Sequence, residues 1–423
     1  MKALSPLILF LVIYLGVSVI SGDFYKMPVT VAFLISGIYA VAITKGKLDQ
    51  RIKVFSRGAG SDNVLLMVWI YILAGAFATS AKAMGAVDAT VALTLQVLPA
   101  SFVLPGIFLA ACFISLAIGT SVGTVVALTP VAVGITAEST ISLPLMLGIV
   151  VGGAFFGDNL SFISDTTIAA TQTQGCKMNE KFKANIAIVL PVALLMLIIY
   201  YILGRDTVFN PDVTNEAWWK ILPYLLVIVT AVCGINVMVV LLLGILSAGM
   251  IGIADGSYGI FELMGIIGNG IVSMGDLIVM AILAAGMLEM IRYNGGIDYL
   301  INRLTSNISA TKGAQFSIAA LVGLVDICTA NNTVSIITTG PIAKDIASRY
   351  GIRPRHSACI LDTASCCVQG LLPYSAQVIT ATALASASGI MVSPLSICAN
   401  LYYPLGIGLS LAVAILFFRG RTR

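Results

Sequence analysis

A run of polar side chains interrupts an apolar segment at residues 157–167. The run is Gly157-Asp158-Asn159-Leu160-Ser161-Phe162-Ile163-Ser164-Asp165-Thr166-Thr167, which supplies two carboxylates, one amide and four hydroxyls. Hard cations such as sodium are bound by several oxygen atoms, and unwound backbone carbonyls at helix ends add further ones. The run therefore predicts a cation site with ligands from these residues: Asp158, Asn159, Ser161, Ser164, Asp165, Thr166 and Thr167.

Three smaller polar groups stand inside other apolar segments, near residues 120, 330 and 362. A lone serine or threonine in a membrane helix usually bonds back to its own backbone. Carboxylates within such segments are costly, and they usually mark a substrate or ion pathway. We therefore expect the three groups to line the route of an ion or substrate: Thr120, Ser121, Thr124, Asp326, Thr329, Asn331, Asn332, Thr333 and Asp362.

Composition indicates where these groups lie. Of the 423 residues, 59% are apolar and 10% are charged, and the mean hydropathy is +1.02. A soluble domain carries roughly a quarter charged residues. Apolar stretches of ~20 residues, the length that spans a bilayer, recur along the whole chain. These features predict an all-α polytopic membrane protein.

The apolar stretches define about ten spans, of which 143–175 and 357–389 are long and polar in the middle. Each of these two is predicted to be a helix broken near the bilayer midplane. Residues 107–136 and 314–343 are predicted to be re-entrant hairpins, because irregular backbone at membrane depth must be enclosed by protein or water. The ten spans are 3–20, 27–44, 64–83, 143–175, 186–203, 220–234, 236–254, 276–291, 357–389 and 396–418.

The basic residues orient this topology. With the N-terminus inside, the cytoplasmic side receives all of the 23 basic residues except four: Lys26, Lys82, Arg205 and Lys220. Excess lysine and arginine in cytoplasmic loops is the ordinary arrangement of membrane proteins. The chain is therefore predicted to be a multi-pass protein with both termini in the cytoplasm.

Six acidic residues remain at membrane depth or near its edges on this topology. No lysine or arginine is left to pair with them, because Lys181 and its neighbours are assigned to the cytoplasmic side. An unpaired buried carboxylate must be protonated, hydrated or bound to a cation. Competition between a proton and a metal ion for one site is the chemistry this predicts. The six residues are Asp158, Asp165, Asp276, Glu289, Asp326 and Asp362.

The second half of the chain repeats the first with an offset of about 211 residues. The segment from Thr120 to Thr124 matches that from Thr329 to Thr333, and Pro191 matches Pro404. Each copy contains five crossings and one hairpin, so an odd number of crossings inverts the second copy. Inverted repeats place the substrate site near the midplane, between broken helices. The division is a first repeat at 1–203, an extracellular linker at 204–219 and a second repeat at 220–423.

The chain resembles the NhaC-type sodium/proton antiporters of the broader ion-transporter superfamily. The motifs that carry the resemblance are Gly119-Thr120-Ser121-Val122-Gly123-Thr124 and, about 30 residues later, the run at 157–167. The family pattern is roughly G-T-S-x-G-T and then G-D-[KN]-x-S-P-[LI]-S-D-T-T; Phe162 stands at its proline. The resemblance implies location in the bacterial inner membrane, separate scaffold and transport domains, and a homodimer.

The function expected from these observations is secondary active transport that exchanges sodium for protons by alternating access. The alternative is sodium- or proton-coupled transport or exchange of a small organic solute, an amino acid or a carboxylate. No enzyme activity is expected, because H-E-x-x-H is absent, and no nucleotide loop of the G-x-x-x-x-G-K-[ST] type occurs. The partners expected are the lipid bilayer, sodium, protons and an organic solute in the alternative, with no cofactor and no nucleic acid.

Overall fold

The computed structural model describes residues 2–21, 27–87, 89, 99–161, 164–208, 217–233, 235–296, 299 and 310–417. Every regular element in these ranges is a helix, and the all-α prediction is confirmed. Among the described residues, five helices or helix runs are long and apolar enough to cross a membrane: Val64–Ala83, Leu143–Gln174, Met178–Leu203, Ile260–Tyr293 and Thr311–Thr329.

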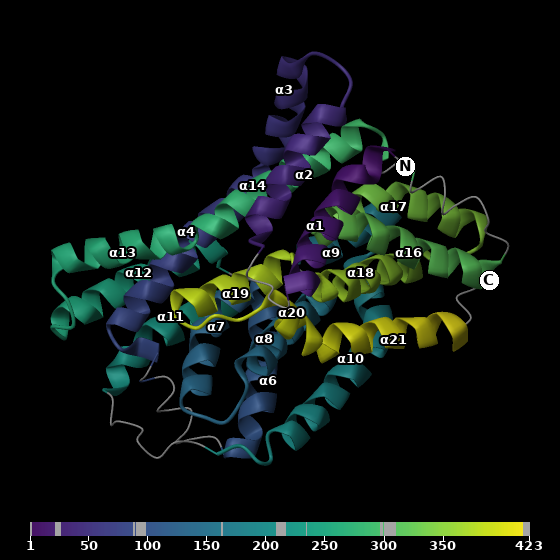
Figure 1. Ribbon diagram of the computed structural model, residues 1–423. Coiled ribbons are helices and arrows are strands. Elements are labelled where there is room, and N and C mark those ends of the chain that lie inside the picture. Colours follow the sequence, from purple (N-terminus) through teal and green to yellow (C-terminus); the bar gives the residue numbers. More distant parts are fainter. Residues whose placement is uncertain are drawn as a thin grey trace.

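One group of helices forms a framework along one side of the molecule (Figure 1). Within it α4 packs against α12 and α13, and α14 packs against α2 and α3. The members, which we call the framework helices, are η1 (Lys2–Leu4), α1 (Ser5–Ser21), α2 (Val29–Ile43), α3 (Leu48–Ala59), α4 (Asp62–Ala83), η2 (Trp218–Ile221), α11 (Leu222–Val232), α12 (Val237–Ala254), α13 (Ile260–Ser273) and α14 (Gly275–Tyr293).

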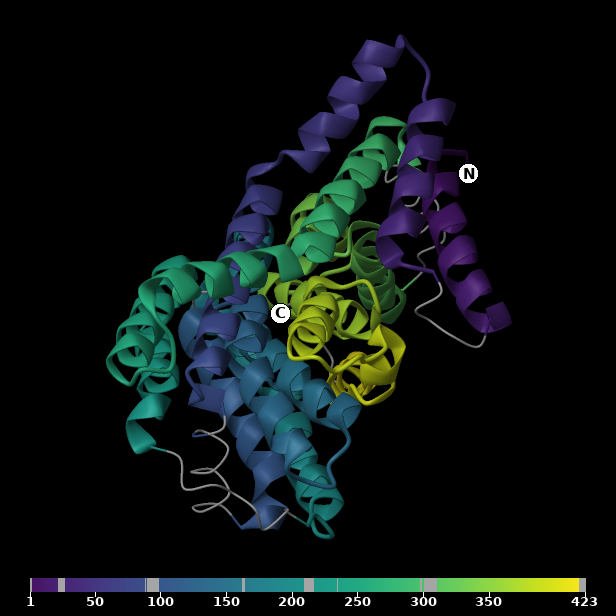
Figure 2. The same ribbon diagram turned by 60° about the vertical axis from the view of Figure 1, so that its left-hand side comes forward.

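The remaining helices, which we call the core helices, pack around α8 and α18 (Figure 2). The window of α8 and α9 that is apolar enough to span a membrane is buried throughout. The core helices are α6 (Ala100–Ile118), α7 (Ser121–Ala137), α8 (Leu143–Leu160), α9 (Asp165–Gln174), α10 (Met178–Leu203), α16 (Thr311–Thr329), α17 (Asn332–Arg349), α18 (Pro354–Leu371), α19 (Ala376–Ala387), α20 (Pro394–Ala399) and α21 (Tyr402–Phe417).

Two pairs of core helices, α6 with α7 and α16 with α17, are each joined by a two-residue turn. The first turn places Gly119 at φ 72° and Thr120 at φ −144°, and the second places Ala330 at φ 48° and Asn331 at φ −149°. Glycine tolerates the left-handed conformation, whereas alanine pays ~1–2 kcal/mol there. Ala330 is the one non-glycine residue with positive φ in the described part of the chain. These pairs lie where hairpins were expected.

Two further pairs are helices interrupted by a short break. The helix α8 ends at Leu160 and α9 begins at Asp165, while α18 ends at Leu371 and α19 begins at Ala376. The breaks fall inside the segments 143–175 and 357–389, as the polar residues predicted. Within the first break Phe162 and Ile163 lie outside the described residues.

The helix α14 covers the span expected at 276–291, and the structure adds the helix α13 directly before it. The described helix run begins at Ile260, because α13 and α14 are separated only by Met274. Residues 260–273 were not predicted to be a span, because the polar residues Glu262 and Asn269 interrupt the apolar run there. The side chain of Asp276 lies outside the described part of the structure.

Two glycines let framework helices touch backbone to backbone. A Cβ added at Gly58 of α3 would lie 2.5 Å from the carbonyl oxygen of Ala285 in α14. A Cβ added at Gly270 of α13 would lie 2.4 Å from the carbonyl oxygen of Gly75 in α4. Small residues at such crossings permit the close helix packing typical of membrane proteins.

Candidate functional site

The two turns and the two helix breaks meet around a cavity of about 110 Å³. Both halves of the chain line it, so residues from four separate polar groups of the sequence share one space. We call it the central cavity. Its lining is Leu66, Ile70, Thr120, Ser121, Val122, Asp158, Asp165, Asn331, Asn332, Thr333, Gln369, Ala376 and Gln377.

Asp158 stands in the last turn of α8 and is 2% exposed. Its Oδ1 accepts a hydrogen bond from the backbone N–H of Ser121 at 3.2 Å. Its carbonyl oxygen accepts hydrogen bonds from the hydroxyls of Thr166 at 3.1 Å and Thr167 at 3.2 Å. The carboxylate therefore meets the turn between α6 and α7, while the carbonyl holds α9 across the break.

Asp165 is the first residue of α9, and its side chain is exposed in the central cavity. Its Oδ1 accepts a hydrogen bond from the backbone N–H of Thr166 at 2.9 Å, and its Oδ2 accepts one from the Thr333 hydroxyl at 2.7 Å. The positive end of the helix dipole favours an anion at this position. Among the described residues, neither Asp158 nor Asp165 forms an ion pair with lysine or arginine.

Several predicted ligands support the site from outside the cavity lining. Ser161 donates to the carbonyl of Leu116 at 2.8 Å, and the hydroxyls of Ser164 and Thr166 lie 2.9 Å apart. The side-chain amide of Asn159 donates to the carbonyl of Phe155, and Thr124 bonds back to Thr120. These contacts fix the shape of the break and of the adjacent helix. Of the seven predicted cation ligands, Asp158 and Asp165 line the cavity.

Lys181 overturns the expectation that no basic residue pairs with the buried acids. It stands near the start of α10, is 1% exposed, and forms an ion pair with Asp362 at 2.5 Å. Its Nζ also donates to the carbonyl of Asn159 at 2.6 Å and to the Thr167 hydroxyl at 2.8 Å. The ammonium thus has three acceptors. Asp362 pairs with this lysine and is not among the residues that line the central cavity.

Asn185 and Thr363 extend this buried network. The side-chain amide of Asn185 donates to the same Asn159 carbonyl at 2.8 Å, and its oxygen accepts from the Thr363 hydroxyl at 2.9 Å. The carbonyl in the last turn of α8 therefore receives two donors from α10. Hydrogen-bonded buried networks of this kind hold a polar region of the interior in one arrangement.

Asp326 is not among the residues that line the central cavity. It is fully buried in α16, and neither carboxyl oxygen has a hydrogen-bond partner. Its backbone carbonyl accepts from the amide of Ala330 at 2.7 Å, which closes the turn after α16. The structure therefore places the Asp326 side chain outside the central cavity, although the sequence grouped it with the pathway residues.

Two glutamines line the cavity, and one of them, Gln377, joins the two halves. The Gln377 amide donates to the Ser121 hydroxyl at 2.9 Å, and the Gln369 amide donates to the carbonyl of Ala330 at 2.8 Å and to the Gln377 side-chain oxygen at 3.2 Å. Gln377 was not among the residues predicted from the sequence, where its signal was an amide inside an apolar span.

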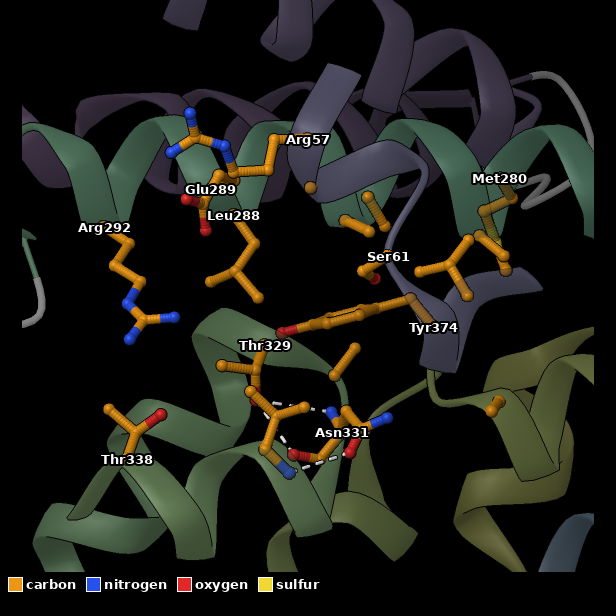
Figure 3. Close-up of a pocket in the computed structure, with 18 of the residues that line it drawn as sticks. Arg57, Ser61, Met280, Leu288, Glu289, Arg292, Thr329, Asn331, Thr338 and Tyr374 are labelled. Atoms are coloured by element: carbon orange, nitrogen blue, oxygen red, sulfur yellow. Dashed lines mark hydrogen bonds between the residues drawn. The ribbon is translucent and has the colours of Figure 1, made fainter. Parts of the chain in front are cut away.

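A larger cavity of about 390 Å³ lies between framework and core helices (Figure 3). Arg57 of α3 and Glu289 and Arg292 of α14 stand at one side of it, and Thr329 and the turn at Asn331 form the opposite wall. Asn331 and Ala376 line both cavities, so the two spaces adjoin. We call this larger space the framework cavity.

Buried carboxylates, helix breaks and helix-pair turns meeting inside an all-helical, apolar molecule define a multi-pass membrane transporter. The chain belongs to the Na+/H+ antiporter family, whose profile matches residues 3–205 and 213–418. The resemblance seen in the two sequence motifs is thereby confirmed. The family consists of antiporters and not of enzymes.

Individual relatives are distant but match along most of their length. The Na(+)/H(+) antiporter NhaC of Bacillus subtilis (strain 168) is 24% identical over 370 residues, 79% of each chain. The Malate-2H(+)/Na(+)-lactate antiporter of the same organism is 24% identical over 414 residues, 89% of this chain and 87% of that protein. Among solved structures, the Alcanivorax borkumensis YdaH transporter aligns with a TM-score of 0.43 and 15% identity over 86% of each chain.

Proposed function

We propose that this protein exchanges sodium for protons across the bacterial inner membrane, and that both ions use the carboxylates of Asp158 and Asp165. The observation that carries the proposal is that these two carboxylates line one cavity and have no basic partner among the described residues. The Asp158 carboxylate is buried, so its charge is costly unless a proton or a cation neutralises it, and Asp165 faces the same cavity. Family membership supports the same pair of ions.

The neighbouring groups suit this competition. Thr333 and the backbone N–H groups of Ser121 and Thr166 donate to the carboxylates, so they stabilise the charged state that a cation requires. When a proton binds instead, the neutral carboxyl needs no metal. Sodium and a proton therefore exclude each other at the site, which couples their movements.

Lys181 has a supporting role in this proposal. Its ion pair with Asp362 and its bond to the carbonyl of Asn159 hold the last turn of α8, which carries Asp158. We assign Asp362 to this support rather than to the ion pathway.

Matched contacts support two inverted repeats at 1–203 and 220–423, with the linker at 204–219. The helix α4 packs on α12 and α13 as α14 packs on α2 and α3. Gly58 and Gly270 make similar close contacts with a neighbouring helix, and their positions differ by one residue from the 211-residue offset. The turns at Gly119 and Ala330 are separated by 211 residues. The ten spans, the two re-entrant hairpins and the cytoplasmic termini belong to the same proposal.

Alternating access would follow from movement of the core helices against the framework helices. The framework cavity lies between the two groups and reaches the turn at Asn331, next to the central cavity (Figure 3). Arg57 and Arg292, which line it, belong to the side that the basic residues assign to the cytoplasm. This arrangement supports an inward-facing state. The homodimer implied by the family resemblance stays a prediction.

A second candidate function is coupled exchange of a small organic carboxylate. The framework cavity has a volume typical of small-molecule sites, mostly apolar walls, and two arginines that suit a carboxylate. A relative named as a malate and lactate antiporter matches most of the chain. In this case the solute would occupy the framework cavity, and the central carboxylates would bind the coupling cation.

Reconstitution into liposomes with a trapped pH-sensitive dye tests both candidates. An inward sodium gradient should move protons outward in the absence of any organic solute. Proton movement that requires an added carboxylate would instead support the second candidate. No proton movement with sodium, lithium or any carboxylate would overturn both.

A further inference from the structure

A third cavity, of about 290 Å³, lies among α10, α16, α18 and α21. These four helices pack together, on the side of the molecule where the C-terminus lies (Figure 1). None of its lining residues lines the central cavity or the framework cavity. The lining is Lys183, Ala184, Ala187, Ile188, Gln315, Arg355, His356, Cys359, Ile360, Leu411, Ala414 and Ile415.

The polar part of this cavity is basic. Lys183 and Arg355 are cationic, His356 stands beside them, and no acidic residue occurs among the described residues that line the cavity. Neither Lys183 nor Arg355 forms an ion pair in the described part of the chain. The Nε of Arg355 is buried and has no hydrogen-bond partner. A buried guanidinium donor without an acceptor indicates that an anion completes the site.

The rest of the cavity is apolar. Eight of its twelve lining residues carry only apolar side chains or a thiol. The helices that form its walls also expose large apolar residues, among them Leu194 on α10 and Leu409 and Phe417 on α21, which are 54%, 69% and 77% exposed. In a membrane-spanning helix such side chains face acyl chains. The ligand that matches both parts has an anionic head and a hydrocarbon body.

We propose that this cavity binds an anionic phospholipid, with the phosphate between Lys183 and Arg355 and an acyl chain along α10 and α21. Both residues stand near the starts of their helices, at the end that the basic residues assign to the cytoplasm. Basic pockets between membrane helices on that side suit lipid head groups. The apolar walls favour a lipid over free phosphate, which shares only the head-group chemistry.

The site adjoins the support of the transport centre. Cys359 lines the cavity, and its thiol lies 3.5 Å from the carbonyl oxygen of Lys181, the residue that pairs with Asp362. A lipid bound between α10 and α18 therefore holds together the two helices that carry this ion pair. We expect anionic lipid to raise the thermal stability of the protein.

The test is thermal unfolding and native mass spectrometry of the full chain in detergent, with added dioleoylphosphatidylglycerol or dioleoylphosphatidylcholine. Phosphatidylglycerol should stabilise the wild type and stay bound, and phosphatidylcholine should do neither. The variant K183Q/R355Q should bind phosphatidylglycerol about thirtyfold more weakly, since each basic residue near a membrane surface contributes a factor of about five. If the double variant unfolds, lipid binding is measured on the single variant K183Q, which changes only an exposed side chain.

Two controls make the result specific. K183R/R355K keeps both charges and should keep the preference, and Lys53→Gln removes an exposed charge on α3 and should change nothing. Equal stabilisation by both lipids, or unchanged binding by K183Q/R355Q, would overturn the proposal. So would inorganic phosphate that reproduces the full effect without lipid. Because binding is measured without transport, the result is independent of sodium/proton exchange.

Discussion

Lys181 and Asp362 stand 181 residues apart in the chain, and their side chains form an ion pair at 2.5 Å with 1% and 0% exposure. Taking two charges out of water costs several kcal/mol per ion, and only excellent geometry with further hydrogen bonds offsets the cost. Here the ammonium also reaches Asn159 and Thr167. The pair therefore fixes α10, α18 and the broken helix α8–α9 relative to one another.

We predict that Lys181→Met or Asp362→Leu alone destabilises the protein by ~3–5 kcal/mol, because each leaves one buried charge without its partner. The double variant should lose less than the sum, since it leaves no unpaired charge. Thermal and denaturant unfolding in detergent measures both effects. As a control, Lys220→Met removes a partly exposed pair with Asp255 and should shift the midpoint little. Additive losses would show that the two residues are not coupled.

We predict that Asp158→Asn and Asp165→Asn each abolish sodium-driven proton movement while the proteins stay folded. An amide of the same shape keeps the packing but cannot alternate between a proton and a cation. The dye-loaded liposome assay measures the loss, and size-exclusion profiles check folding. Glu180→Gln, an exposed acid at the start of α10, serves as the matched control and should exchange normally. Normal exchange by both aspartate variants would remove the assignment.

We predict that Thr333→Val raises the sodium concentration for half-maximal exchange by roughly tenfold or more. The Thr333 hydroxyl donates to Asp165 at 2.7 Å, and a hydrogen bond to a charged group contributes ~1.5–3 kcal/mol. Thr382→Val removes a hydroxyl that bonds back to the carbonyl of Val378 at 2.9 Å, and it should leave the sodium dependence unchanged. Equal behaviour of the two variants would show that the contact does not serve ion binding.

Local patterns in the sequence predicted the helices and their interruptions. Polar residues in apolar runs marked the break between Leu160 and Asp165, and glycine and amide residues marked the turns at Gly119 and Asn331. These features can be recognised in the sequence because a polar group inside a membrane span is costly unless the local structure satisfies it. The residues at the two turns were predicted to line the route of an ion or substrate, and the first break to bind a cation; in the structure Ser121, Asp158 and Thr333 line one central cavity.

Tertiary pairing could not be predicted from the same patterns. Lys181 lies between Lys177 and Lys183, in the segment that connects two predicted spans, so it was assigned to the cytoplasmic side. Only the packing of α10 against α18 brings it to Asp362. Likewise Gln377 carries no motif, and its role appears only where it meets Ser121 from the other half. Contacts between distant segments decided both cases.

We predict that Gly270→Ala and Gly58→Ala each destabilise the protein by ~1–3 kcal/mol, the usual range for overpacking. The added methyl would lie 2.4 Å from the carbonyl oxygen of Gly75 in one variant and 2.5 Å from that of Ala285 in the other. Gly265→Ala, on the same helix as Gly270, meets no atom within 4 Å and should be neutral or slightly stabilising.

Thermal unfolding in detergent compares the three glycine variants. Similar losses at Gly58 and Gly270 support the equivalence of the two halves, because each glycine approaches a carbonyl oxygen on a helix of the opposite repeat. A loss at Gly270 with none at Gly58 would show that α3 and α13 are not equivalent, and the inverted-repeat proposal would lose its packing support. A loss at Gly265 as large as the others would show that the close approach to a carbonyl oxygen does not cause the losses at Gly58 and Gly270.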